Sequence, residues 1–335
     1  MRKFMVFLSI LFVIGLSLFA ASCFMGTTFS EYRDMILDEE NYEEKIIVHQ
    51  YNEDEIKLDF NLSSKNVVFQ YEETSEITIK YYENIEKDEV VNTYQDGTLA
   101  FSIKRKWYFN IYFLPFLTEK YDLMTVTLPK DIVFENFKIK VSSGNITIPS
   151  LKVNDKIDLL TSSGKINVND INTNGFYTEV NSGNVVINNL ITSDIQARIS
   201  SGNLSVNNVT CNNMTINMNS GNAHIKYATV KNADVRIQSG NLVFDNSKVD
   251  NFSNLKISSG IVTLNKVELT NINATVSSGS LKLNIKDAKD FEYDLKASSG
   301  SIKINGQGQG SRYQKNGTEG LIYIRITSGW IEINY

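Results

Sequence analysis

The chain has 335 residues, of which 42% are hydrophobic and 21% are charged, and this is the composition of a folded protein. Its formal net charge of −5 argues against a nucleic-acid partner, because nucleic-acid-binding proteins need a basic surface. The two cysteines, Cys23 and Cys211, cannot form a disulfide framework, and Cys23 lies in an apolar N-terminal segment. We therefore expect Cys211 to be a lone thiol.

Residues 1–26 predict a membrane anchor or a lipoprotein signal. Arg2 and Lys3 precede an apolar run from Phe4 to Met25, which is long enough to cross a bilayer. The same run has the charged and apolar regions of a secretory signal. Positive charge stays on the cytoplasmic side, so the rest of the chain is expected to be extracytoplasmic and anchored to the membrane through its N-terminus.

The end of this segment contains a candidate lipidation site. Ala20-Ala21-Ser22-Cys23 resembles a bacterial lipobox, in which small residues precede the modified cysteine. An uncleaved single-pass helix, a lipid anchor at Cys23, and a cleaved signal with a secreted product remain alternatives. Residues 27–43 are rich in Asp and Glu and predict an acidic tether between the anchor and the folded part.

A Ser-Gly pair preceded by a polar residue recurs ten times in residues 131–335. The intervals are 19 to 21 residues, except for the last, which is 29. This regularity indicates a repeat architecture. The glycines are Gly144, Gly164, Gly183, Gly202, Gly221, Gly240, Gly260, Gly279, Gly300 and Gly329.

Apolar residues alternate with polar ones on both sides of these glycines. They recur seven, five and three positions before the glycine and two and four positions after it, as in Ile195, Ala197 and Ile199 before Gly202. A period of two predicts strands with one buried face. Two strands and one corner per repeat predict an all-β fold, namely a parallel β-solenoid with a single strand per face and about ten coils of 19–20 residues.

The glycines are predicted to be structural turns, because a corner between strands needs a residue that accepts positive φ or a close neighbour. Asn follows the glycine in five copies, and stacked Asn side chains can form hydrogen-bonded ladders. Those residues are Asn145, Asn184, Asn203, Asn222 and Asn241.

Residues 44–130 have strand patterns without the glycine spacing and predict a divergent β region that caps the solenoid. The run from Leu62 to Val67 resembles a degenerate corner. At the other end, the polar segment from Gly306 to Gly320 is expected to lengthen the last coil and to shield its edge. The strands expected in the cap are Lys45–Gln50, Glu55–Phe60, Asn66–Tyr71, Glu76–Tyr82, Thr98–Lys106 and Leu123–Leu128.

One segment combines basic and aromatic residues and is a candidate contact surface. Such a segment is typical of a membrane interface or of a protein-binding surface, and it could equally pack over the open end of the solenoid. The candidate residues are Lys104, Arg105, Lys106, Trp107, Tyr108, Phe109, Phe113 and Phe116.

The Ser-Ser-Gly-Asn-Ile-Thr-Ile unit from Ser142 to Ile148, together with Leu128-Pro129, resembles a bacterial "putative adhesin" family of unknown-function domains with serine-glycine β-repeats, which includes LiaG-like proteins. The resemblance covers residues 45–335. It implies a surface or envelope protein with an N-terminal membrane segment, and some members of the family are linked to envelope-stress operons. The resemblance brings no catalytic residue.

The residues predict no catalytic, cofactor or metal site. Asp158, Asp234 and Asp294 share one position in the repeat, but their coils are not neighbours. His49 and His224 are far apart, and no metal-ligand spacing occurs. We therefore expect a non-enzymatic cell-surface adhesin or binding scaffold whose partner is an unknown protein or glycan surface. An envelope-stress sensor or regulator and a polysaccharide-active β-helix enzyme are the alternatives.

Overall fold

The computed structural model describes residues 41–50, 56–106, 119–287 and 289–335, which form an all-β structure. In these residues α3 (Glu119–Asp122) is a single helical turn, and no helix there is long and apolar enough to cross a membrane. The predicted anchor and tether up to residue 40, including Cys23, lie outside the described residues. The strands are β1 (Tyr42–Gln50), β2 (Ile56–Ser64), β3 (Asn66–Glu72), β4 (Glu76–Asn84), β5 (Asp88–Gln95), β6 (Thr98–Arg105), β7 (Leu123–Pro129), β8 (Val133–Ser143), β9 (Ile146–Ile148), β10 (Leu151–Asn172), β11 (Gly175–Ile191), β12 (Asp194–Asp245), β13 (Lys248–Ile285), β14 (Glu292–Ile304), β15 (Gln307–Gly308), β16 (Arg312–Lys315) and β17 (Leu321–Asn334).

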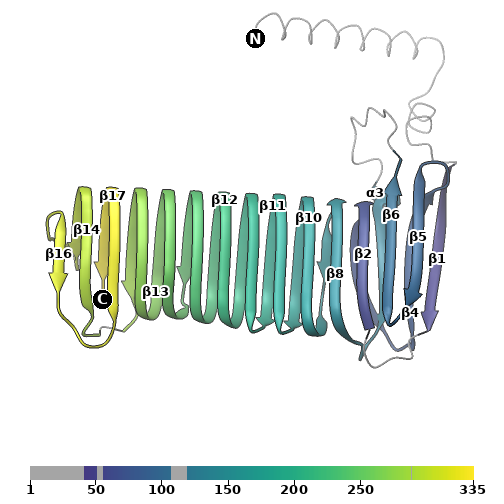
Figure 1. The fold of residues 1–335 in the computed structure, drawn as a ribbon, viewed down its shortest axis with the longest axis horizontal. Coiled ribbons are helices and arrows are strands. Elements are labelled where there is room, and N and C mark those ends of the chain that lie inside the picture. Colours follow the sequence, from purple (N-terminus) through teal and green to yellow (C-terminus); the bar gives the residue numbers. More distant parts are fainter. Residues whose placement is uncertain (1–40, 51–55, 107–118, 288) are drawn as a thin grey trace, which may run out of the picture.

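Most of the chain is wound so that each repeat pairs in parallel with the next. β10 pairs with β11, and β11 with β12, in a register that places Gly164 opposite Gly183 and Gly183 opposite Gly202. The long rod in Figure 1 results from this stacking. Because side chains alternate along each strand, the predicted inward residues form one continuous buried core, in which Ile187 and Leu264 are fully enclosed.

The corner glycines are held in a backbone conformation that L-residues avoid, with φ between 126° and 153°. Each also lies against the corner residue of a neighbouring coil. A Cβ on Gly202 would lie 1.6 Å from the carbonyl oxygen of Gly183. Next to this column the side-chain amides form a ladder, in which Asn203 donates to Asn184 at 2.9 Å and Asn222 donates to Asn203 at 3.1 Å.

The structure has a second corner in each central coil, which the sequence analysis did not predict. It lies six residues after the glycine, where non-glycine residues have φ between 47° and 57°. The sequence does contain a signal for this corner. Inward residues lie four and seven positions after the glycine, three residues apart, whereas a straight strand would place successive inward residues two apart. The residues at this corner are Asp170, Asn189, Asn208, Tyr227, Asn246 and Lys266.

At the N-terminal end the parallel pairing gives way to antiparallel strands. β2 pairs in parallel with β8 and β6, and β5 then pairs antiparallel with β6. Next to β9, β3 and β7 pair in parallel, and β4 and β1 follow in antiparallel order. The six strands expected here are present, and the expected corner at Leu62 to Val67 lies opposite the Gly144 corner, with Ser64 facing Ser143. The expectation omitted β5.

The C-terminal end departs from sequence order. β17 lies between β13 and β14, with Gly329 opposite both Gly279 and Gly300 (Figure 1). The segment after β14 therefore carries the chain back by one coil instead of lengthening the last coil. Within it, β16 pairs antiparallel with β14 and covers the edge of that strand, so the expected shielding is made by a strand.

Candidate binding face

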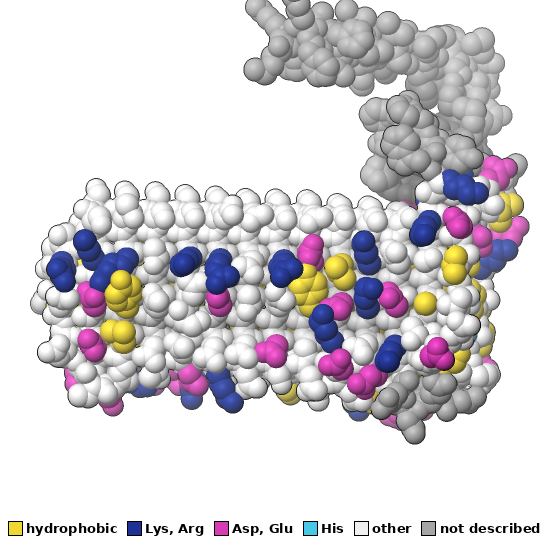
Figure 2. All heavy atoms as spheres, viewed as in Figure 1, with side chains coloured by type: hydrophobic (Ala, Val, Ile, Leu, Met, Phe, Trp, Pro, Cys, Tyr) yellow, Lys and Arg dark blue, Asp and Glu magenta, His cyan; other side chains and the backbone are white. Residues whose placement is uncertain are grey.

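One face of the rod presents charged or aromatic side chains in most of its coils. We define the first face as the outward side chains four and six residues before each corner glycine. Figure 2 shows Lys and Arg side chains in a row along the rod, below an edge without charged or hydrophobic side chains. The basic residues four positions before a glycine are Lys140, Arg198, Arg236, Lys256, Lys296 and Arg325.

A groove of about 460 Å³ lies on the first face near the N-terminal end. It forms where the antiparallel hairpin of β5 and β6 meets the parallel strands β2, β8 and β10. Small side chains of β2 and β6 are bordered by lysines of β8 on one side and by Val91, which is 49% exposed, on the other. The residues around the groove are Asp59, Asn61, Val91, Ala100, Phe101, Ser102, Lys138, Lys140 and Leu160.

The next coil towards the C-terminus places Tyr177 between two cations. The Lys156 amino group lies 5.4 Å from the ring centroid, and the Arg198 guanidinium lies 5.5 Å from it. Arg198 also donates to the tyrosine oxygen at 3.2 Å, while the hydroxyl donates to Glu179. Partial burial and this carboxylate raise the pKa of Tyr177, so the ring presents a neutral phenol.

The first face has the chemistry of a binding surface. It offers cations, amides, hydroxyls and an aromatic ring on a rigid sheet, and these groups favour polar or anionic partners. Its aspartates are ion-paired within their own coils or with the adjacent coil: Asp158 with Lys156 at 2.7 Å, Asp234 with Arg236 at 2.7 Å, and Asp294 with Arg325. The described residues contain no group of three or more His, Cys, Asp or Glu that could hold a metal ion.

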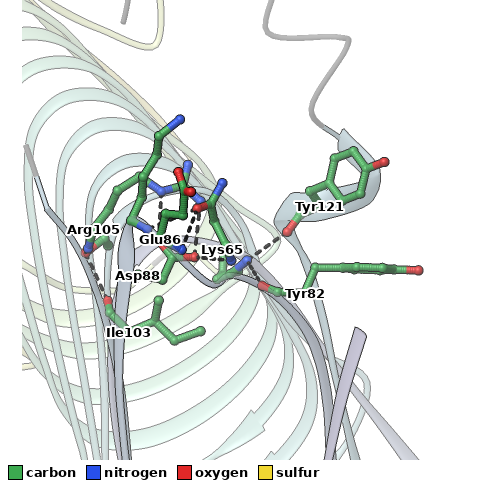
Figure 3. A network of polar contacts seen from close by, with 10 residues as sticks. Lys65, Tyr82, Glu86, Asp88, Ile103, Arg105 and Tyr121 are labelled. Atoms are coloured by element: carbon green, nitrogen blue, oxygen red, sulfur yellow. Dashed lines mark hydrogen bonds and ion pairs between the residues drawn. The ribbon is translucent and has the colours of Figure 1, made fainter. Parts of the chain in front are cut away.

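A buried polar network lies at the N-terminal end of the glycine column. Lys65 occupies the corner position there and is 1% exposed, and its amino group donates to the carbonyls of Tyr82 at 2.8 Å and Tyr121 at 2.7 Å (Figure 3). Burial lowers the pKa of Lys65 to about 8. Lowered lysine pKa values are also found in catalytic sites, but here both carbonyl bonds tie α3 and β4 to the first corner.

The predicted basic and aromatic surface is described only in part. Arg105 donates to the fully buried Asp88 carboxylate at 2.9 Å and lies over the Tyr42 ring, so its charge stabilises the cap. Lys104 and Lys106 are exposed at the end of β6. The other five candidates, Trp107, Tyr108, Phe109, Phe113 and Phe116, lie outside the described residues, so contact of this segment with a membrane or a partner stays a prediction.

Cys211 is a free cysteine inside the core, 4% exposed, and burial raises the pKa of its thiol to about 12. It therefore packs as an apolar residue. The groove and the cations around Tyr177 were not predicted from the sequence. The available signal was the basic residue recurring four positions before the glycine, since this position faces outward in every coil.

Comparisons with known proteins place the chain in a family. A search of curated proteins finds no match. The solved structures that match include a protein of Clostridium sporogenes named a "putative cell adhesion protein", at 14% identity and a TM-score of 0.24, covering 88% of this chain and 99% of that one. A "putative adhesin" of Bacteroides fragilis matches at 10% identity and a TM-score of 0.38, covering 88% and 97%. A "putative lipid binding protein" of Parabacteroides distasonis matches at 13% identity and a TM-score of 0.40, covering 71% and 93%.

The family model described as Toastrack DUF4097 matches residues 55–193 and again residues 192–320, which together form most of the chain. The two matches meet within the stack of parallel coils, so this one rod contains two consecutive copies of the family's pattern. The chain belongs to the Toastrack DUF4097 family.

Proposed function

We propose that this protein is a non-enzymatic binding scaffold of the bacterial cell surface, held at the membrane by residues 1–26 and extended outward as a solenoid of about ten coils. In this proposal the first face contacts a protein or glycan surface, as expected of an adhesin related to the LiaG-like proteins. The acidic segment predicted at residues 27–43 separates the rod from the membrane up to residue 41, because β1 already begins at Tyr42.

The observation that carries the proposal is the display of unpaired basic groups on a rigid face. Parallel pairing places corresponding side chains of adjacent coils about 4.8 Å apart, so basic groups on coils that are not neighbours lie at multiples of this spacing. Arg236 and Arg325 have acidic partners, whereas Lys140, Lys256 and Lys296 have no ion pair among the described residues. A preorganised row of this kind binds an extended polar surface at little cost in conformational entropy.

The test displays the full chain on a bacterium that does not itself adhere. Attachment to immobilised matrix proteins and polysaccharides is measured as a function of cell density. We expect saturable attachment that falls at least about fivefold in the double variant Lys140→Ala and Arg198→Ala. Lys152→Ala is the matched control, because Lys152 is exposed in the same part of the rod outside the first face.

The outcomes separate this function from its alternatives. Attachment that does not saturate, or that falls equally in the control, contradicts a binding role for the first face. If deletion of the gene instead changes the response of the native cells to membrane-active antibiotics while attachment stays intact, the envelope-stress sensor is favoured. Release of reducing ends from the polysaccharides by the purified protein favours the enzyme.

A further inference from the structure

A second hollow, outside the first face, lies along the second corner of the coils. Its volume is about 220 Å³, below the roughly 300 Å³ at which pockets begin to enclose drug-sized ligands. It can therefore hold about one residue of a longer ligand. The hollow is lined by Tyr227, Ala228, Thr229, Asn246, Ser247, Lys248, Lys266, Glu268 and Lys286.

Tyr227 gives the hollow an aromatic wall in an unusual place. The same corner position is Asn in the coils on either side, Asn208 and Asn246, and the backbone there is left-handed. Asn tolerates this conformation, whereas a bulky aromatic residue is strained in it. The Tyr227 side chain is also 59% exposed, so burial in the core does not compensate for the strain.

The opposite side of the hollow is basic. Lys266 has left-handed φ at the equivalent corner two coils further on, and no ion pair is formed by it among the described residues. Lys286 is paired with Glu268 at 2.5 Å, and Lys248 also lies close to that carboxylate. The lining therefore carries three positive charges and one negative charge. Two further carboxylates lie outside the lining: Asp250 is ion-paired with Lys248 at 3.9 Å, and Asp287 lies close to Lys286. Lys266 is therefore the lysine of the lining without an ion pair among the described residues.

The floor of the hollow is made of small residues that need no ligand. Ala228 is 1% exposed, and the Ser247 hydroxyl accepts from the Ala228 amide at 3.1 Å and donates to the Asp245 carbonyl at 2.9 Å. The tyrosine and the lysines of the lining are thus the groups left to contact a ligand. An aromatic ring and ammonium groups around a shallow floor suit a ring with one apolar face and an acidic substituent.

We propose that this hollow binds one acidic sugar residue of a polysaccharide, with the pyranose ring against Tyr227 and its acid group on Lys266 and Lys248. The ligand class is an anionic glycan, for which an oligomer of galacturonic acid is the probe. The site does not depend on the first face and can exist whether or not that face mediates attachment.

The full-length protein in detergent micelles is titrated calorimetrically with tetragalacturonate, with maltotetraose as the neutral sugar and tripolyphosphate as the anion without a sugar ring. We expect tetragalacturonate to bind with a Kd below about 10 mM and the other two to bind at least about tenfold more weakly. Tyr227→Asn should weaken binding about tenfold, and Lys266→Asn about fivefold. Both variants place Asn at a corner that accepts it elsewhere, so folding is preserved.

The control is Lys231→Asn, which removes an exposed lysine of the same coil as Tyr227 from outside the hollow and should leave binding unchanged. The double variant of Lys140 and Arg198 should also leave it unchanged, and this separates the hollow from the first face. Undetectable binding of tetragalacturonate overturns the proposal. If maltotetraose binds as tightly as tetragalacturonate, the lysines have no role in binding, and if tripolyphosphate does, the tyrosine has none. Either result also overturns the proposal.

Discussion

The corner glycines allow a stability prediction that separates steric exclusion from backbone strain. In Gly202→Ala, the new Cβ would lie 1.6 Å from the Gly183 carbonyl oxygen, whereas real Cβ atoms essentially never come closer than 3.0 Å. The coils must therefore move apart by more than about 1 Å, which disrupts nearby ladder hydrogen bonds at about 1 kcal/mol each. Backbone strain at φ +144° adds about 1–3 kcal/mol. We expect the free energy of unfolding to fall by about 4 kcal/mol.

Two other glycines provide matched controls. Gly306 has φ +78°, and apart from its two chain neighbours no atom of the described residues lies within 4 Å of the position that a Cβ would take, so Gly306→Ala should cost only the strain, about 1 kcal/mol. Gly308 has neither constraint, and Gly308→Ala should be neutral to within about 0.5 kcal/mol. Urea unfolding of the purified variants, followed by circular dichroism, gives the free energy of unfolding of each of the three. If Gly202→Ala is no more destabilising than Gly306→Ala, contact between coils does not explain the glycine column.

Three further predictions concern the buried lysine, a buried hydroxyl and the amide ladder. The pKa of Lys65 is about 8 in the folded protein and near 10.5 in the unfolded chain, so the unfolded chain binds more protons and stability rises with pH. Measured relative to Lys65→Met, the free energy of unfolding should rise by about 2 kcal/mol from about pH 7 to 9.5. A difference between the two proteins that stays constant with pH would refute the lowered pKa. The buried Thr178 hydroxyl has no hydrogen-bond partner among the described residues. Thr178→Val should therefore stabilise the protein by about 1 kcal/mol and raise its melting temperature. A lower melting temperature would show that the hydroxyl is hydrogen-bonded. Lys165 interrupts the side-chain amide ladder between Asn145 and Asn184. Lys165→Asn should join the two parts and raise the free energy of unfolding, measured in urea, by about 0.5–1 kcal/mol. A lower free energy of unfolding would show that the ladder contributes nothing to stability.

The strands and the corner column were predictable because both are local. Alternation of apolar residues indicates which face of a strand is buried. A glycine that recurs every 19–21 residues indicates a backbone position with no room for a side chain. The run from Leu62 to Val67 could be recognised without its glycine, because the spacing of its neighbours was preserved. The same local signal explains why β1, β2, β3, β4, β6 and β7 were expected in nearly their observed positions.

The order of the coils in space was not predictable in the same way. Inward positions of β13, β14 and β17 are nearly interchangeable aliphatic or aromatic residues, so hydrophobic pattern alone cannot decide which strand lies beside which. The hollow was missed for a different reason. Tyr227 is unusual only by comparison with the corner residues of other coils, and that corner had not been recognised from the sequence.

The placement of β17 between β13 and β14 constrains how the chain can be completed during synthesis. Coils up to β13 can be added one after another as they leave the ribosome, since each pairs with a coil already made. β14 emerges before β17, but among the described strands β17 is its parallel partner. The far end of the rod can therefore close only after β17 has been made, and a chain cut short before residue 321 would leave both β13 and β14 with open edges.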